Sequence, residues 1–159
     1  MNPVENLILG FQDLVAQLPE WVQPLIVALA GAVPFIEGEG GTVIGVVGDD
    51  GVHAAAAGNF IAVAIVVLLG AQIRAAFTRR RQPRPRSARR EKFQKAFNRY
   101  GVAGVSLLGP LLLPTHFTAA ALAGSGVAKG RVLAWQAVAI VLWTTLTLLI
   151  ITGIIAIAG

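Results

Sequence analysis

The chain of 159 residues contains no cysteine and has few charged residues for its length. Without cysteine it can form no disulfide bond, no thiolate metal site and no thiol nucleophile. Charged residues make up 13% of the chain, whereas a soluble domain carries about 25%. So little charge cannot cover a water-facing surface, which argues against a soluble globular protein. The hydrophobic share of 55% and the mean hydropathy of +0.71 indicate a membrane protein instead.

Lysine and arginine are absent from the first 73 residues, which carry seven acidic side chains. The segment from Arg74 to Arg99 carries eleven basic residues and one acidic residue, and beyond it only Lys129 and Arg131 are charged. In so apolar a chain, this pattern predicts a cytoplasmic basic loop in contact with anionic lipids rather than nucleic-acid binding. The residues assigned to orientation and lipid contact are Arg79, Arg80, Arg81, Arg84, Arg86, Arg89, Arg90, Lys92, Lys129 and Arg131.

The first 23 residues predict an amphipathic helix at the membrane interface. Asn2 can cap this helix, Pro3 suits its first position, and Glu5 completes a capping box. Apolar residues recur behind them at helical spacing, and Trp21 follows as an interfacial aromatic residue. A helix packed on the other segments explains the same pattern equally well.

Two apolar segments, residues 24–50 and 100–128, are interrupted by glycine and proline, and the first also carries four acidic residues. The first has apolar arms of 13 and seven residues, whereas a membrane span needs about 20 residues. Short arms around a polar apex predict re-entrant hairpins, which are tolerated where protein or water surrounds them. For residues 100–128, a single kinked span stays open as the alternative. The residues predicted to break the helices are Pro34, Gly38, Gly40, Gly41, Pro110 and Pro114.

Each predicted hairpin is followed by a long apolar segment, residues 51–77 and 131–158. Between the two halves, residues 78–99 predict a basic cytoplasmic loop with an amphipathic helix. Because a single span separates the halves, they face opposite sides of the membrane, as inverted-topology repeats do. We therefore expect an all-α integral membrane protein with one membrane domain over residues 1–159.

Glu37 and Glu39 are the main candidates for function, because a carboxylate at membrane depth is costly to bury. Burial and a neighbouring like charge both raise a carboxyl pKa, so one member of the pair is suited to exchanging a proton. The alternative is a shallower hairpin with both side chains in water. His116 lies at the corresponding depth of the second hairpin, either as a partner of Glu37 or as a structural histidine. Further polar candidates for a substrate or proton path are Thr115, Thr118 and Asn59.

The motifs PFIEGEGG in the first hairpin and GPLLLP in the second, each followed by a span, resemble the small multidrug export family. A more distant likeness is to the DedA (VTT-domain) superfamily. The resemblance implies a bacterial inner-membrane protein that moves small molecules or lipid carriers. In DedA proteins an acidic residue of the first hairpin and arginines of the second are thought functional. Glu37 and Glu39 match the first, whereas residues 100–128 contain no arginine.

The sequence thus predicts a proton-coupled exporter of small, cationic or amphipathic molecules. The alternatives are a flippase of a phospholipid or polyprenyl-phosphate carrier, and a structural or assembly membrane protein without transport activity. The motifs of metalloproteases and serine hydrolases are absent, so we expect no enzyme, metal or cofactor. Two spans and two hairpins are too few to enclose a substrate path. A homodimer or higher homo-oligomer is therefore expected, with close contacts at Gly124, Gly126 and Gly130.

Overall fold

The structure is a computed structural model that describes residues 2–45, 51–78 and 101–158. The described residues form helices and turns and contain no strand, which confirms the predicted all-α class. The expected amphipathic helix near residues 87–99 and the acidic pair at 49–50 lie outside these residues. The elements are α1 (Pro3–Gln17), α2 (Gln23–Gly31), α3 (Glu37–Gly45), α4 (Gly51–Thr78), α6 (Val102–Leu108), the 3-10 helix η2 (Gly109–Leu111), α7 (Thr115–Ser125) and α8 (Lys129–Ala158).

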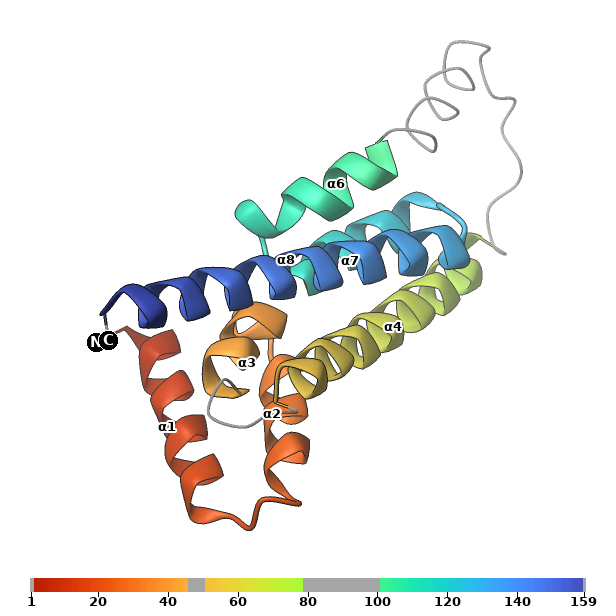
Figure 1. The fold of residues 1–159 in the computed structure, drawn as a ribbon. Helices are drawn as coiled ribbons and strands as arrows, with labels where there is room; N and C mark the ends of the chain where they lie inside the picture. The colour runs from red at the N-terminus through yellow and green to blue at the C-terminus, as the bar shows by residue number, and fades with distance from the viewer. Residues whose placement is uncertain (1, 46–50, 79–100, 159) are drawn as a thin grey trace. The chain divides into compact units, whose positions relative to one another are not determined.

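Helices α4 and α8 are the two long elements of the chain (Figure 1). They have 28 and 30 residues, which at about 1.5 Å per residue exceeds the ~30 Å hydrocarbon core of a bilayer. By length and composition, Gly51–Ala76 and Lys129–Ile157 are candidate membrane spans, and they match the two predicted spans. The short helices α2, α3, α6 and α7 have at most 11 residues, so none of them is long enough to cross.

Helix α4 has one buried face and one exposed face. Its buried positions Ala55, Asn59, Val63 and Val67 recur every four residues, which places them on one side of the helix. Large apolar side chains fill the opposite side, and a contiguous exposed apolar surface of this kind suits contact with lipid. The exposed apolar side chains of α4 are Ile61, Ile65, Leu68, Leu69 and Ile73.

The chain forms two compact units that differ in charge. We call residues 1–62 with 138–159 the acidic unit and residues 63–137 the basic unit. Seven of the eight acidic residues belong to the first, and all 13 lysines and arginines belong to the second. Helices α4 and α8 contribute residues to both units.

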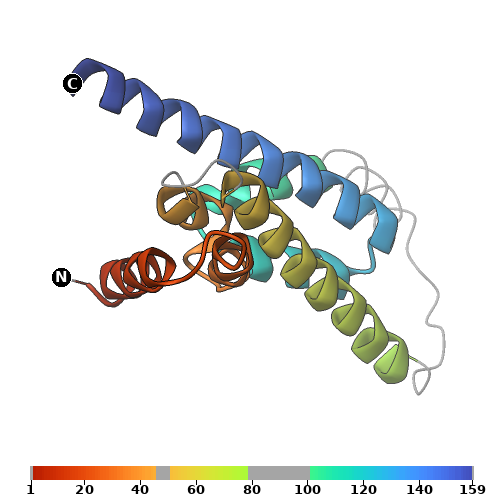
Figure 2. The same cartoon turned by 60° about the horizontal axis from the view of Figure 1, so that its bottom comes forward.

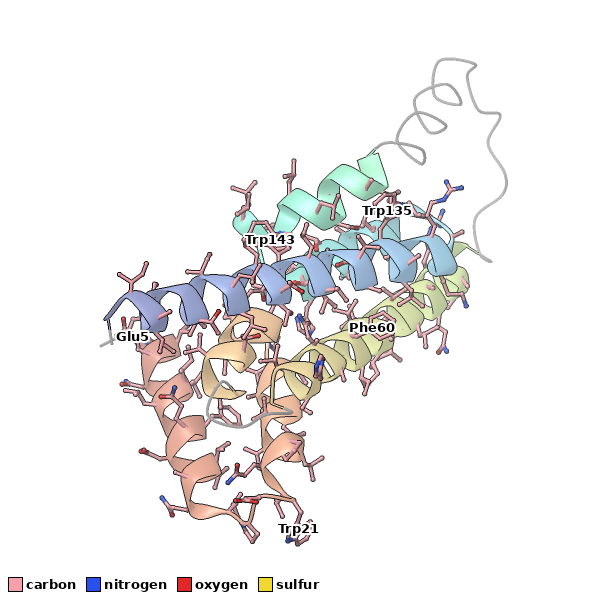
Figure 3. All side chains as sticks on the ribbon, in the orientation of Figure 1. Glu5, Trp21, Phe60, Trp135 and Trp143 are labelled. Carbon is pink, nitrogen blue, oxygen red and sulfur yellow. The ribbon has the colours of Figure 1, made fainter. Side chains whose placement is uncertain are left out.

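Helix α1 opens the acidic unit, and its capping follows the sequence prediction. The Asn2 side chain accepts a hydrogen bond from the Glu5 backbone N–H at 2.9 Å, and the Glu5 carboxylate accepts one from the Asn2 backbone N–H at 2.8 Å. This reciprocal capping box satisfies two N–H groups that have no partner within the helix. After α1 the chain turns past Trp21, whose side chain is exposed and projects from the tip of the turn (Figure 3).

Helices α1, α2 and α3 pack around one small apolar core in the acidic unit (Figures 1 and 2). Glycines bring α2 against α4 at backbone distance, because a Cβ added to Gly31 or Gly58 would collide with a backbone carbonyl of the other helix. Small residues at such crossings are the usual means by which membrane helices approach closely. The buried members of the core are Val15, Val27, Ala30, Ile36, Ile44 and Ala55.

The basic unit contains α6, η2 and α7, together with parts of α4 and α8. Helix α6 ends in the 3-10 turn η2 around Pro110, and α7 starts directly after Pro114. A proline lacks the backbone N–H that a helix interior needs, which explains both interruptions. Residues 101–128 thus form two helices around a break, while their re-entrance into a membrane stays a prediction.

Candidate functional site

The turn between α2 and α3 is the most strained backbone among the described residues. Phe35 has φ of 75° and Glu37 has φ of 52°, and they are the two residues other than glycine with positive φ in this part of the chain. Such left-handed positions cost about 1–3 kcal/mol each and cluster at functional sites. Backbone N–H groups of Ile36 and Glu37 both donate to the Val33 carbonyl, at 3.1 and 3.0 Å, and hold the turn in place.

The glycines after this turn differ from their predicted role. We expected Gly38, Gly40 and Gly41 to form the apex of the hairpin, but they lie within α3, and the turn precedes them. Glycine is needed at these positions because a larger side chain would not fit against the neighbouring residues. A Cβ at Gly41 would lie 2.7 Å from the Ala55 side chain, and one at Gly40 would lie 2.9 Å from Ile36. The glycines therefore let α3 approach its neighbours rather than let the chain reverse.

Two buried polar side chains meet α3 at Gly38. A Cβ added to this glycine would lie 2.5 Å from the Thr144 hydroxyl oxygen and 3.5 Å from the Asn59 amide nitrogen. Asn59 comes from α4 and Thr144 from α8, and both are buried. Their Oδ1 and Oγ1 atoms have no hydrogen-bond partner among the described residues. Gly38, Asn59 and Thr144 form what we call the Gly38 cluster.

Glu37 immediately precedes Gly38 and is the one buried acidic residue in the described part of the chain, with 6% of its surface exposed. One turn further along α3, the Thr42 hydroxyl donates to the Gly38 carbonyl at 2.6 Å. Glu39, on the same helix and outside the two candidate spans, is partly exposed. Desolvation raises the pKa of the Glu39 carboxyl, a backbone hydrogen bond opposes this, and the charge of Glu37 adds to it.

The basic unit holds a second set of buried polar side chains at the start of α7. Thr115, His116 and Thr118 are all buried there. The Thr118 hydroxyl donates to the Thr115 carbonyl at 2.9 Å and accepts a long hydrogen bond of 3.4 Å from the Gln136 amide of α8. Thr118 also fills the space beside Gly109, where a Cβ would lie 2.6 Å from its methyl carbon.

The end of α7 carries a cationic contact that the sequence did not predict. Gly126 has φ of 91°, and the Arg74 guanidinium of α4 occupies the position of its missing side chain. A guanidinium at this point lies at the negative end of the α7 helix dipole, which favours a cation. Lys129 and Arg131 follow at the exposed start of α8. The basic residues predicted for the loop, from Arg79 to Lys92, lie outside the described residues.

The structure brings together some of the predicted site residues and adds others. Asn59 lies beside Gly38, the residue that follows Glu37, and Thr115, His116 and Thr118 share one helix end. Glu37 belongs to the acidic unit and His116 to the basic unit, so their pairing stays a prediction. Thr144 was missed, because it stands in the apolar run of α8 beside Thr145, and only packing shows which threonine is buried.

The buried polar side chains of the two units offer hydrogen-bonding and titratable groups. Among the described residues, no three histidine, aspartate or glutamate side chains are placed to hold a metal ion. The chain was compared with protein-family models, curated proteins and solved structures, and none of them matches it. The likeness to the small multidrug export family therefore stays a prediction from the sequence, based mainly on the expected hairpin–span architecture and on the element from Pro34 to Glu37.

Proposed function

We propose that the protein is a membrane transporter that exports small molecules in exchange for protons, with Glu37 as the coupling group. The observation that carries this proposal is a carboxylate buried at a strained turn between two helices too short to span a bilayer. A buried carboxylate in a membrane protein is costly, and strained backbone is costly as well. We take the occurrence of a buried carboxylate and a strained backbone at the same residue as support for a functional role of Glu37.

The remaining features of the acidic unit support the same proposal. Glu37 is the buried acidic residue in the described part of this unit, and Glu39 lies two positions further along the same helix. A buried carboxylate is suited to carrying a proton in one state of a transport cycle and releasing it in another. The two short helix pairs, α2–α3 and α6–α7, are proposed to enter the membrane as re-entrant hairpins around the substrate path.

Orientation in the membrane follows from the distribution of charge. We propose a bacterial inner-membrane location with the basic unit's loop in the cytoplasm, since cytoplasmic loops carry an excess of lysine and arginine. The exposed Trp21 at the α1–α2 turn suits the opposite interface, where tryptophan is enriched. A homo-oligomer completes the path, and Gly124 and Gly130 offer the small surfaces for it, because a Cβ at either one would meet no described atom within 4 Å.

Reconstitution into proteoliposomes tests this function. With a pH gradient imposed, efflux of a cationic dye such as ethidium is expected from wild type and is expected to fall at least about 100-fold in Glu37→Gln, which cannot exchange a proton. Glu20→Gln, an exposed acidic residue before α2, is the matched control and is expected to transport like wild type. Unchanged dye efflux in Glu37→Gln would contradict the coupling role. Movement of a fluorescent polyprenyl phosphate without dye efflux would favour the flippase, and movement of neither would favour a structural protein.

A further inference from the structure

The Gly38 cluster contains two buried oxygen atoms that the fold leaves without a partner among the described residues, Asn59 Oδ1 and Thr144 Oγ1. Asn59 is 1% exposed and Thr144 is 4% exposed, so bulk water does not reach either side chain. Leaving a buried acceptor or hydroxyl unsatisfied costs about 1–3 kcal/mol. Two such atoms at one place call for a polar occupant, because buried polar groups in native proteins are nearly always hydrogen-bonded.

The two side chains meet at Gly38. The Thr144 hydroxyl oxygen lies 2.5 Å and the Asn59 amide nitrogen 3.5 Å from the position that a Cβ of Gly38 would take. The nearest apolar neighbour of that position, the Ile140 side chain, is 3.8 Å away. The unpartnered Oδ1 belongs to the same Asn59 amide group, so this acceptor and the Thr144 hydroxyl are suited to a single water molecule, which needs two to four polar partners.

The Gly38 cluster lies next to Glu37 in the chain, so a water molecule bound there is suited to exchanging protons with this residue. Glu37 is the residue next to Gly38 and is 6% exposed, so a buried water beside Gly38 would give its carboxylate a route for exchanging protons. The other titratable side chains described in the acidic unit are Glu39 on the same helix, Glu5 and Asp13 on α1, Glu20 before α2 and His53 on α4. Asn59 and Thr144 do not titrate, so they can hold a water molecule without competing for its proton.

We propose that Asn59 and Thr144 are positioning residues that bind a buried water molecule beside Gly38, and that this water relays protons to and from Glu37. In the uptake step the water gives one proton to a carboxylate oxygen and regains one from the aqueous side, so that its own composition is unchanged. The reverse sequence releases the proton. As a relay in transport, the inference rests on the proposed function, whereas the water site and its effect on proton exchange can be measured without transport.

A rapid pH jump on the purified protein in detergent tests the relay directly. Protonation of Glu37 is followed by the infrared absorbance of the neutral carboxyl group, and its band is identified by its loss in Glu37→Gln. Thr144→Val and Asn59→Leu are expected to slow protonation about tenfold or more, because each removes one partner of the water. Thr144→Ser keeps the hydroxyl and is expected to restore the rate. Thr145→Val, at the exposed neighbouring position of α8, is the matched control with a wild-type rate.

The outcomes separate the relay from the transport proposal. Wild-type protonation rates in both Thr144→Val and Asn59→Leu would overturn the relay, even if dye efflux is present. Slowed protonation in these variants without dye efflux in wild type would overturn the transport function and leave the relay standing. If Thr144→Val fails to fold, Thr144→Ala decides instead, because it removes the hydroxyl and leaves more space. A high-resolution structure with no ordered water between Asn59 and Thr144 would also overturn the proposal.

Discussion

The two short helix pairs differ in how much strained backbone they contain. In the acidic unit, the α2–α3 turn places Phe35 and Glu37 at positive φ, and buried oxygens of the Gly38 cluster have no partner among the described residues. In the basic unit, positive φ falls on Gly126, which tolerates it, while Ser106 Oγ and Gln136 Oε1 are buried without a partner among the described residues. Both units thus hold unsatisfied polar atoms, and only the α2–α3 pair adds strained backbone, which makes the acidic unit the better place to look for function.

Helix packing gives the largest expected difference between the pairs. Gly58→Ala is expected to destabilise the protein by about 1–3 kcal/mol, because the new Cβ would collide with the Ala28 backbone carbonyl, which cannot rotate away. Gly104→Ala in α6 meets no described atom within 4 Å and is expected to be neutral or stabilising by up to about 1 kcal/mol. The free energy of unfolding in mixed micelles measures both. Equal losses of unfolding free energy in Gly58→Ala and Gly104→Ala would contradict the expected difference in helix packing.

The left-handed position at the end of α7 gives the next effect. Gly126→Ala is expected to cost about 1–2 kcal/mol, because a side chain at φ of 91° is strained and Arg74 occupies its place. The thermal unfolding midpoint is expected to fall accordingly. Gly124→Ala, two residues earlier in open space, serves as the control and should leave the midpoint unchanged or higher. A Gly126→Ala variant as stable as wild type would show that the backbone at the end of α7 and the Arg74 side chain adjust without cost.

Relief of strain in the α2–α3 turn gives a smaller effect of opposite sign. Phe35→Gly is expected to stabilise the protein by up to about 1 kcal/mol, because glycine accepts φ of 75° and the Phe35 side chain is 64% exposed. Dye efflux is expected to slow in the same variant if the strained turn takes part in transport. Phe117→Ala, an exposed phenylalanine at normal φ in α7, controls for the loss of an aromatic side chain. A Phe35→Gly variant less stable than wild type would contradict the assignment of strain.

The hydrogen bond between α7 and α8 gives the smallest effect. Gln136→Leu is expected to change the unfolding free energy by less than about 1 kcal/mol, because the bond to Thr118 is long at 3.4 Å and the Gln136 Oε1 atom has no partner among the described residues. Dye efflux is expected to stay at the wild-type rate. A strong loss of efflux would place function in the basic unit as well and would weaken the contrast between the two pairs.

Local features of the sequence predicted local features of the fold. Asn2, Pro3 and Glu5 form the capping box as expected, since a cap depends on residues only three positions apart. The two long helices match their predicted segments because continuous apolar composition over more than 20 residues leaves few alternatives. The role of the α3 glycines was less predictable. A glycine that permits a turn and one that permits close packing look the same in a sequence.

The sequence by itself determined the all-helical class, the separation of acidic from basic residues and the presence of Glu37 in an apolar segment. Composition, charge and period are properties of neighbouring residues, so they need no knowledge of the fold. Only the tertiary structure decided that the strain falls on Phe35 and Glu37, and that Asn59 and Thr144 meet at Gly38. Those residues lie far apart along the chain, and the packing of α3 against α4 and α8 alone brings them together.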